Sequence, residues 1–232
     1  MSIVKVGRVQ IYSAKILCYH MGIMTKDLRN IIFRESVRLW GEKGYENVSM
    51  RDIAAACNIG TGNLTYYFPK KDDILMHYHD WVVDLVEGTF NELDDEPTGL
   101  AGYFALEYAF MYCIVFYVNE LYKQVINIPD LRRRYYVQHH RLYKHFTGKK
   151  LDRADWAATV AMCNMEYGLT ETDVLKEEFD IAIEKIFETR FIMDKRKPKG
   201  WRDEIAKGMA LGKQLAAKIA EKTADAWSVG ES

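Results

Sequence analysis

Polar side chains between residues 49 and 71 could contact the base edges and phosphates of DNA. The amide of Asn63 can form two hydrogen bonds to adenine, and the guanidinium of Arg51 suits the two acceptors of guanine. The methyl group of Thr61 can contact the methyl group of thymine. Such contacts require one surface that carries all of these side chains, so the elements that position them have to be identified.

Other residue types lack the spacing that catalysis or metal binding requires. His77 and His79 lie two residues apart, on different faces of a helix, and the adjacent His139 and His140 diverge likewise. The chain contains no P-loop, GxGxxG, GxSxG or HExxH pattern. The four cysteines form no CxxC and are typical of reduced, cytosolic thiols. We therefore expect no enzyme, no metal and no cofactor.

Helix signals surround the polar stretch. An apolar stripe predicts a first helix that Thr25 caps and Gly44 ends, with Leu28, Ile31, Ile32, Val37, Leu39 and Trp40 on the stripe and Phe33 beside it. Ser49 and Asp52 form an acidic variant of the capping box and start a short second helix.

A second short helix follows a tight turn. Asn58 tolerates the left-handed backbone of such a turn, TGNLTYYF is helical, and Pro69 stops it. Ala54 and Ala55 allow close approach, and the apolar residues that would lock the pair onto the first helix are Ile53, Ile59, Leu64 and Phe68. A long helix then runs from Lys70 to about Asn91. Two short helices joined by a short turn form a helix-turn-helix.

The stretch from Thr25 to Leu75 resembles the DNA-binding domain of the tetracycline-repressor (TetR) family of bacterial transcriptional regulators. The residues that carry the resemblance are EKGYENVSMRDIAAACNIGTGNLTYYFPKKDDIL, with the helix that precedes them. It covers roughly 50 of 232 residues. Two positions depart from the family pattern: Asn58 stands where glycine is usual, and Thr65 stands where the first tyrosine of a Leu-Tyr-Tyr run is usual.

The resemblance implies a function for this head. The start of the second short helix would enter the major groove, where Thr61, Gly62 and Asn63 face base edges, and Arg51 matches a position that often reaches a base. The groups expected at phosphates are Ser49, Tyr66, Tyr67 and Lys71. Each also has a structural interpretation, because Ser49 caps a helix in any case and one of the two tyrosines could pack on the first helix. With Thr65, these residues complete the candidate DNA-binding set.

The body after residue 73 is rich in aromatic residues, most of them tyrosines, between Gly102 and Ile126. Buried hydroxyls need partners, which favours a partly open pocket over a plain core. The candidate effector-binding residues are Tyr103, Tyr108, Met111, Tyr112, Phe116, Tyr117, Met162 and Met165. The resemblance implies that the effector is small and often apolar or aromatic.

A homodimer on a palindromic operator is the second implication. Trp156, Val160, Cys163 and Tyr167 share one helix face, and Phe179, Ile183, Ile186 and Phe187 share the next. These faces form either a four-helix interface or part of the core of one chain, and the resemblance favours the interface. Trp201, Ile205, Met209, Leu215 and Ile219 predict a final docked helix.

Charge and composition complete the prediction of an all-α protein. Residues 1–72 hold 11 Lys and Arg against 6 Asp and Glu, so a basic head precedes an acidic body. The apolar run from Tyr108 to Asn119 is too short for a membrane span. We expect an N-terminal extension (1–23), a DNA-binding domain (24–72), an effector-binding and dimerisation domain (73–194) and a linker with a C-terminal helix (195–232). The alternative function is a helical effector-binding or interaction protein that kept the head without operator specificity.

Overall fold

The structure is a computed structural model that describes residues 28–94, 97–117, 120–150, 152, 178–192 and 197–227. Within these ranges every regular element is a helix, which confirms the predicted all-α class. The helices are α1 (Leu28–Lys43), α2 (Met50–Ala56), α3 (Thr61–Tyr67), α4 (Lys71–Phe90), α5 (Gly99–Tyr117), α6 (Glu120–Asn127), α7 (Pro129–Thr147), α10 (Phe179–Ile192) and α11 (Trp201–Trp227). The predictions for the N-terminal extension and for Thr25, Trp156, Val160, Met162, Cys163, Met165 and Tyr167 lie outside the described residues.

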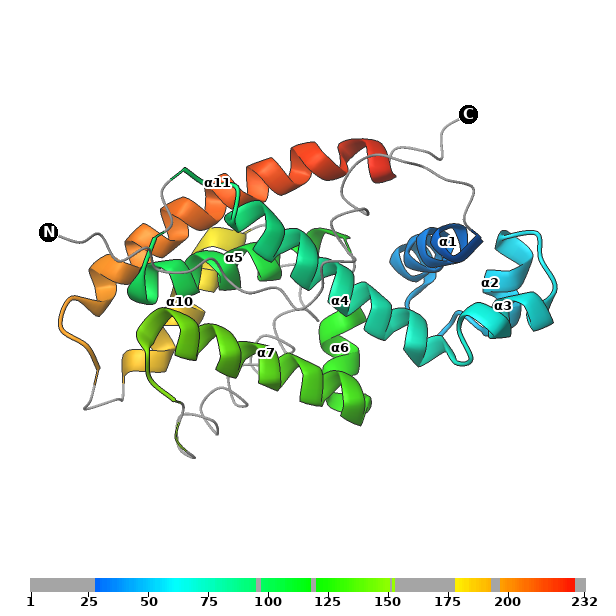
Figure 1. Cartoon of the computed structure of the whole chain (residues 1–232), viewed down its shortest axis with the longest axis horizontal. Coiled ribbons are helices and arrows are strands. Elements are labelled where there is room, and N and C mark those ends of the chain that lie inside the picture. The colour runs from blue at the N-terminus through cyan, green and yellow to red at the C-terminus, as the bar shows by residue number, and fades with distance from the viewer. Residues whose placement is uncertain are drawn as a thin grey trace, which may run out of the picture.

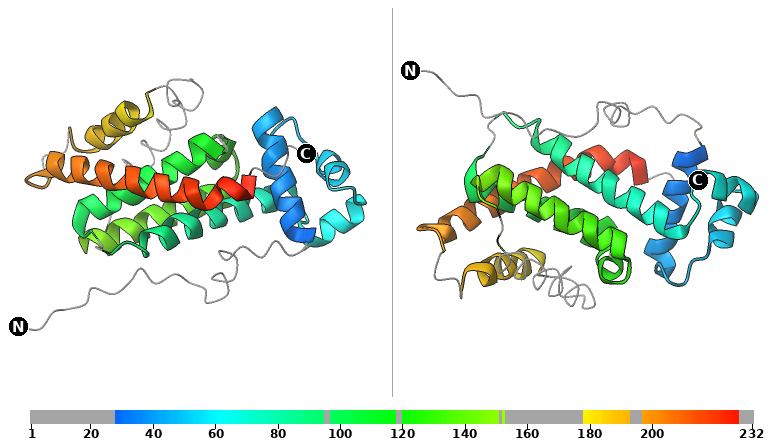
Figure 2. Two further views of the ribbon diagram at one scale, coloured as in Figure 1. Left: turned by 90° about the horizontal axis from the view of Figure 1, so that it is seen from above. Right: turned by 60° about the horizontal axis from the view of Figure 1, so that its bottom comes forward.

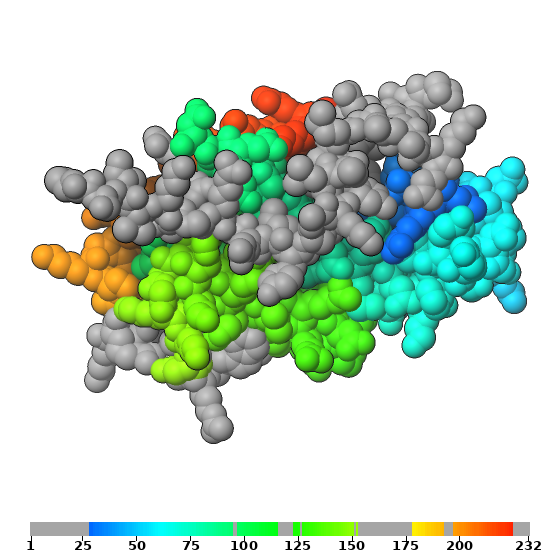
Figure 3. All heavy atoms as spheres, in the orientation of Figure 1, coloured from blue at the N-terminus to red at the C-terminus, as the bar shows by residue number. Residues whose placement is uncertain are grey.

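The helices form two parts that share α4 (Figure 1). The head consists of α1, α2, α3 and the first turns of α4, and it lies at one end of the molecule. The body consists of the rest of α4 with the later helices, and the two further views show the same division (Figure 2). In the space-filling view, α2 and α3 form the end surface of the head (Figure 3). Helix α4 therefore connects the body to the head.

The head is built around a small apolar core. Its most buried side chains are at most 2% exposed: Ile32, Val37, Trp40, Val48, Ile53, Leu64, Phe68, Ile74 and Tyr78. The predicted stripe of α1 differs at one position, because Ile31 is 39% exposed and Phe33 is buried instead. Phe33 packs edge-on against His77 of α4, with ring centroids 5.1 Å apart. The buried face of α1 therefore includes Phe33 in place of Ile31 and otherwise keeps Ile32, Val37, Leu39 and Trp40 as predicted.

The body is organised around α5, whose described side chains from Leu100 to Met111 are all buried. The predicted apolar stripe of α11 is confirmed, because Trp201, Ile205, Met209, Leu215 and Ile219 are all buried. Two glycines let α11 approach α5 closely. A Cβ added at Gly208 would lie 2.6 Å from the Cβ of Phe104, and one at Gly212 would lie 2.6 Å from the Cβ of Tyr108.

Helix α7 runs parallel to α4, and arginines bridge the two helices. Arg134 binds Asp80 and Arg141 binds Glu87, so both pairs join residues 54 positions apart. A constant sequence separation at two places is the signature of parallel helices in fixed register. Pro129 at the start and Gly148 after the end, in the left-handed conformation, set the limits of α7.

The dimer-interface prediction for α10 is wrong at the four residues that it named. Phe179, Ile183, Ile186 and Phe187 are at most 7% exposed within one chain. The ring of Phe187 lies 4.7 Å from that of Phe104 on α5. The alternative interpretation, burial in the core of one chain, is correct, because an apolar face of a helix packs on the nearest apolar surface that the same chain offers.

None of the described helices combines the length and the apolar character that crossing a membrane requires.

Candidate nucleic-acid interface

The start of α2 is fixed by the predicted capping box. The backbone N–H of Asp52 donates to Ser49 Oγ at 3.2 Å, and the backbone N–H of Ser49 donates to Asp52 Oδ2 at 2.7 Å. The hydrogen bonds from Ser49 lower the pKa of the Asp52 carboxyl. Both side chains are exposed, so the cap holds the first turn of α2 at the surface of the head.

The turn between α2 and α3 has the geometry that the sequence predicts. Asn58 has a φ of 53°, in the left-handed region, and its neighbour Ile59 donates from its backbone N–H to the carbonyl of Ala54 at 2.9 Å. Leu64 is fully buried and is the only buried side chain of α3. The helix is thus attached to the head core mainly through Leu64, with Tyr67 partly buried against the same core, and its other residues face outward.

The predicted base-contacting residues are all exposed on the head. Thr61, Gly62 and Asn63, in the first turn of α3, are all exposed, and so is Arg51 near the start of α2. A Cβ added at Gly62 would have no atom within 4 Å, so no neighbour in the described chain requires a glycine there. A missing side chain on an open helix surface is what close approach of another molecule requires.

Three further candidates also lie at this surface. Tyr66 is 83% exposed, while Tyr67 is half-buried, with the two rings 5.2 Å apart and perpendicular. Thr65 is exposed, but its hydroxyl donates to the carbonyl of Gly62 at 3.0 Å. Tyr66 therefore presents a free aromatic side chain to solvent, whereas Thr65 closes a bond within its own helix.

Lys71 occupies a different environment from that of a solvated lysine. Its ammonium donates to the carbonyl oxygens of Tyr45 at 2.8 Å and Val48 at 3.0 Å and lies 4.0 Å from the centre of the Tyr45 ring. The Tyr45 hydroxyl in turn donates to Asp72. Burial and this bond to Asp72 raise the pKa of Tyr45. In this structure Lys71 ties the loop between α1 and α2 to the start of α4.

The same loop is also attached to the body. The side-chain amide of Gln124 on α6 donates to the carboxylate of Glu46 at 2.9 Å. Sequence reasoning missed Tyr45, Glu46 and Gln124 as residues that position the head. Tyr45 lies in the Gly-Tyr pair of the family pattern and could have been noticed there, whereas no pattern links Glu46 to Gln124, 78 residues later.

The predicted effector-binding residues lie in a densely packed region. Tyr103, Tyr108 and Met111 are at most 4% exposed, and Tyr112 is half-buried. The Tyr108 hydroxyl donates to Asp180 at 2.6 Å, which gives one of the buried hydroxyls a protein partner. The side chains of Phe116 and Tyr117 lie outside the described part of the chain, as do Met162 and Met165. An effector site at these residues remains a prediction.

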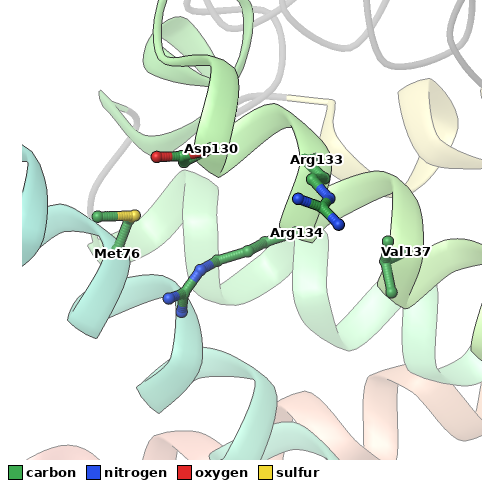
Figure 4. Close-up of a pocket in the computed structure, with 5 residues that line it drawn as sticks. All are labelled: Met76, Asp130, Arg133, Arg134 and Val137. Carbon is green, nitrogen blue, oxygen red and sulfur yellow. The ribbon is translucent and has the colours of Figure 1, made fainter.

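A surface cleft of about 460 Å³ lies elsewhere, between α4 and α7 (Figure 4). Met76 contributes from α4, and Asp130, Arg133, Arg134 and Val137 contribute from α7. Arg134 reaches across the cleft toward α4, where it binds Asp80. In the described residues no group of His, Cys, Asp and Glu could hold a metal ion.

Comparison with known proteins places the head in a family. Residues 32–77 match the model of the bacterial regulatory proteins of the tetR family. The head, residues 32–77, is therefore a DNA-binding domain of the TetR type. A TetR-family head explains why polar residues are exposed along α3, because these proteins are DNA-binding regulators.

Individual relatives are more distant. The chain is 30% identical over 59 residues to YuxN of Bacillus subtilis (strain 168), an uncharacterized HTH-type transcriptional regulator. The match covers 25% of this chain and 20% of YuxN, so the chain spans about a fifth of that relative. A crystal structure from Mesorhizobium loti MAFF303099, provisionally assigned as a TetR-family transcriptional regulator, is 14% identical. The match covers 82% of this chain and 96% of that chain, with a TM-score of 0.40.

Proposed function

We propose that this TetR-family protein represses transcription from a palindromic operator and leaves the operator when a small effector binds. The observation that carries DNA reading is the composition of the α3 surface. Leu64 alone is buried, and the first turn offers a threonine, an open glycine and an asparagine to the outside. A major groove admits a helix of this kind, and its base edges pair with these side-chain types. The four reduced cysteines favour action in the cytoplasm.

We assign the sequence-specific contacts with base edges to Arg51 and Asn63. Arg51→Ala or Asn63→Ala should each reduce the affinity for the operator by about 1–3 kcal/mol and relax the base preference at one position. The measurement is a gel shift with DNA from upstream of the gene, with random DNA as competitor, at several salt concentrations. Lys71→Ala should weaken binding to all DNA sequences alike. If the ammonium of Lys71 turns from the loop carbonyls to a phosphate, the variant should also lower the magnitude of the slope of log affinity against log salt concentration by about one unit.

Matched controls are available on the same domain. Arg38 on α1 is already paired with Glu35 and Glu42, and Asn47 donates to the carbonyl of Lys43. Arg38→Ala and Asn47→Ala remove the same side-chain types away from α3 and should leave the ratio of operator to random affinity unchanged. If Arg51→Ala and Asn63→Ala also leave that ratio unchanged, the reading surface is assigned wrongly.

The second candidate function is an interaction protein that kept the head fold without operator specificity. Thr65 favours it, because the hydroxyl that replaces a tyrosine is bonded to the Gly62 carbonyl and offers less to a DNA backbone. Equal affinity of the wild-type protein for upstream and random DNA would select this candidate.

We also propose a homodimer, with the interface moved to the outer face of α10. Ile181 and Ile192 are 52% and 53% exposed there, while the opposite face of α10 is buried in the chain. Ile181→Glu with Ile192→Lys should give monomers with a folded head, as measured by analytical ultracentrifugation. If the double variant is still a dimer, α10 is not the dimer interface. If the wild-type protein is a monomer, both the dimer and the palindromic operator are excluded.

Release by an effector is proposed to act through α4. This helix starts at the Lys71 contacts in the head and continues for 20 residues into the body. Two half-sites on DNA are spaced about 34–36 Å apart, so a small change in the separation of two heads breaks contacts. We expect a coupling of about 1–3 kcal/mol, and by linkage the effector should bind more weakly to the same extent when operator is present.

A further inference from the structure

A half-buried arginine lies where three helices of the body meet. Arg190 of α10 donates a hydrogen bond to the hydroxyl of Tyr103 on α5 at 2.9 Å. The guanidinium carbon is 5.2 Å from the centre of the Tyr103 ring and 4.9 Å from that of Tyr143 on α7. These two rings are perpendicular, with centroids 5.7 Å apart. Arg190, Tyr103 and Tyr143 together are called the Arg190 site.

The guanidinium of this site has no carboxylate within ion-pair distance in the described residues. The nearby Glu107 is directed elsewhere, with Oε1 2.8 Å from Nδ1 of His139, and both side chains are 7% exposed. Other arginines at the helix contacts of the body are paired, as Arg141 is with Glu87. Arg190 thus uses one of its five N–H donors on a neutral hydroxyl and keeps the others.

The remaining donors of Arg190 are accessible to an anion, because within the described residues they are neither hydrogen-bonded nor among the buried polar atoms without a partner. Arginine does not lose its proton in proteins, so these donors carry a positive charge. The remaining donors lie at the planar edge of the guanidinium. A planar edge with parallel N–H groups matches a carboxylate. The aromatic rings of Tyr103 and Tyr143 beside the guanidinium favour an apolar remainder of the ligand.

We propose that Arg190 binds the carboxylate of a small monocarboxylic acid with an aromatic or aliphatic tail. One unpaired cation matches one negative charge, and Tyr103 and Tyr143 hold the guanidinium in place for it. The regulatory meaning of this site rests on the proposed function, whereas the binding itself does not.

The test uses the full chain without DNA and isothermal titration calorimetry. The probes are benzoate, phenylacetate and octanoate, each compared with its neutral amide. At least one acid should bind about tenfold or more tightly than its amide, because a charge-assisted pair is lost in the amide. Arg190→Met should abolish this preference. Arg202→Met removes an arginine that also lies over an aromatic ring, 4.3 Å from that of Trp201, and should retain the preference.

Arg190→Lys keeps the charge but loses the planar edge, so it should show a smaller preference for the acid over its amide. This variant serves as the test if Arg190→Met does not fold. The proposal is overturned if no acid binds better than its amide, or if the preference survives in Arg190→Met or is undiminished in Arg190→Lys. Acid binding that leaves the operator gel shift unchanged would support the site and contradict its role in release.

Discussion

Helices α3 and α5 are built in opposite ways. α3 buries one side chain, Leu64, and exposes polar residues on the rest of its surface. α5 buries nearly all of its described side chains and has no polar face. A helix held mainly by one residue needs strong local signals, namely a cap, a left-handed turn and an apolar lock, and these signals are visible in the sequence. A helix that is apolar on all sides indicates burial but not which neighbour covers which side.

The largest expected effect follows from the main attachment of α3. Leu64→Ala should lower the free energy of unfolding by about 2–5 kcal/mol, because Leu64 is fully buried in the apolar cluster that also contains Ile53 and Phe68. Chemical denaturation measures this loss. Binding to the operator in the gel shift should be lost at denaturant concentrations at which the body is still folded. Thr65→Ala, on the exposed side of the same helix, should change stability by less than about 0.5 kcal/mol. A loss below about 1 kcal/mol for Leu64→Ala would show that other contacts hold α3.

The fold of the head could be predicted from its sequence because its signals are local. Ser49 with Asp52, Asn58 and Pro69 each act within a few residues, and the structure has helix boundaries at all of them. The packing partners in the body could not be predicted, because periodicity shows that Phe187 is apolar but not that it meets Phe104. Whether such a helix face lies in the core of one chain or at a dimer interface can be seen only in the three-dimensional structure.

The next effect tests how closely the body is packed. Gly208→Ala should destabilise the protein by about 1–3 kcal/mol, because the new Cβ would lie 2.6 Å from Phe104 Cβ and 2.9 Å from the carbonyl oxygen of Ala101. Gly41→Ala is the matched control in the head. It lies in α1 with no atom within 4 Å of the new Cβ, so the better helix former should add about 0.5–1 kcal/mol. If Gly208→Ala is also stabilising in thermal denaturation, the contact of α11 with α5 is looser than the structure has it.

The exposure of the candidate DNA-binding residues could be predicted from the sequence, but not all of their contacts. Arg51 and Asn63 are exposed at the surface that the sequence indicates, which follows from their position relative to the cap and the turn. The contacts of Lys71 with the carbonyl oxygens of Tyr45 and Val48 were not foreseen, because a lysine at a helix start gives no sign of which loop folds over it. Arg190, too, belongs to no motif, and its lack of a carboxylate partner is visible only in three dimensions.

A smaller effect is expected in the body, where the stability of the protein depends on pH through Asp84. Burial and the negative charges of Asp80 and Glu87 raise the pKa of Asp84 on α4 to about 6. The folded protein therefore holds a proton that the unfolded chain has released, and the stability that this proton contributes is lost as pH rises through about 6. Asp84→Asn should raise the free energy of unfolding by about 1 kcal/mol at pH 7.5 and by much less near pH 5. Asp94→Asn, at an exposed position, is the control and should show no such pH dependence.

The smallest effect is expected in the head, with the opposite sign. His77 lies against the rings of Phe33 and Phe68, and burial and the charge of Arg29 lower its pKa. The unfolded chain therefore takes up the proton first, and the stability contributed by neutral His77 is lost as pH falls below the ordinary histidine value of about 6.5. His77→Phe keeps an aromatic ring between Phe33 and Phe68 and should reduce the loss of stability between pH 7.5 and 5.5, by less than about 1 kcal/mol. Denaturation curves of wild type and variant across this range measure the difference. A His77→Phe variant whose stability falls as steeply as that of the wild type would locate the acid sensitivity of the head at another group, because the ring packing is preserved and only the titrating nitrogen atoms have been removed.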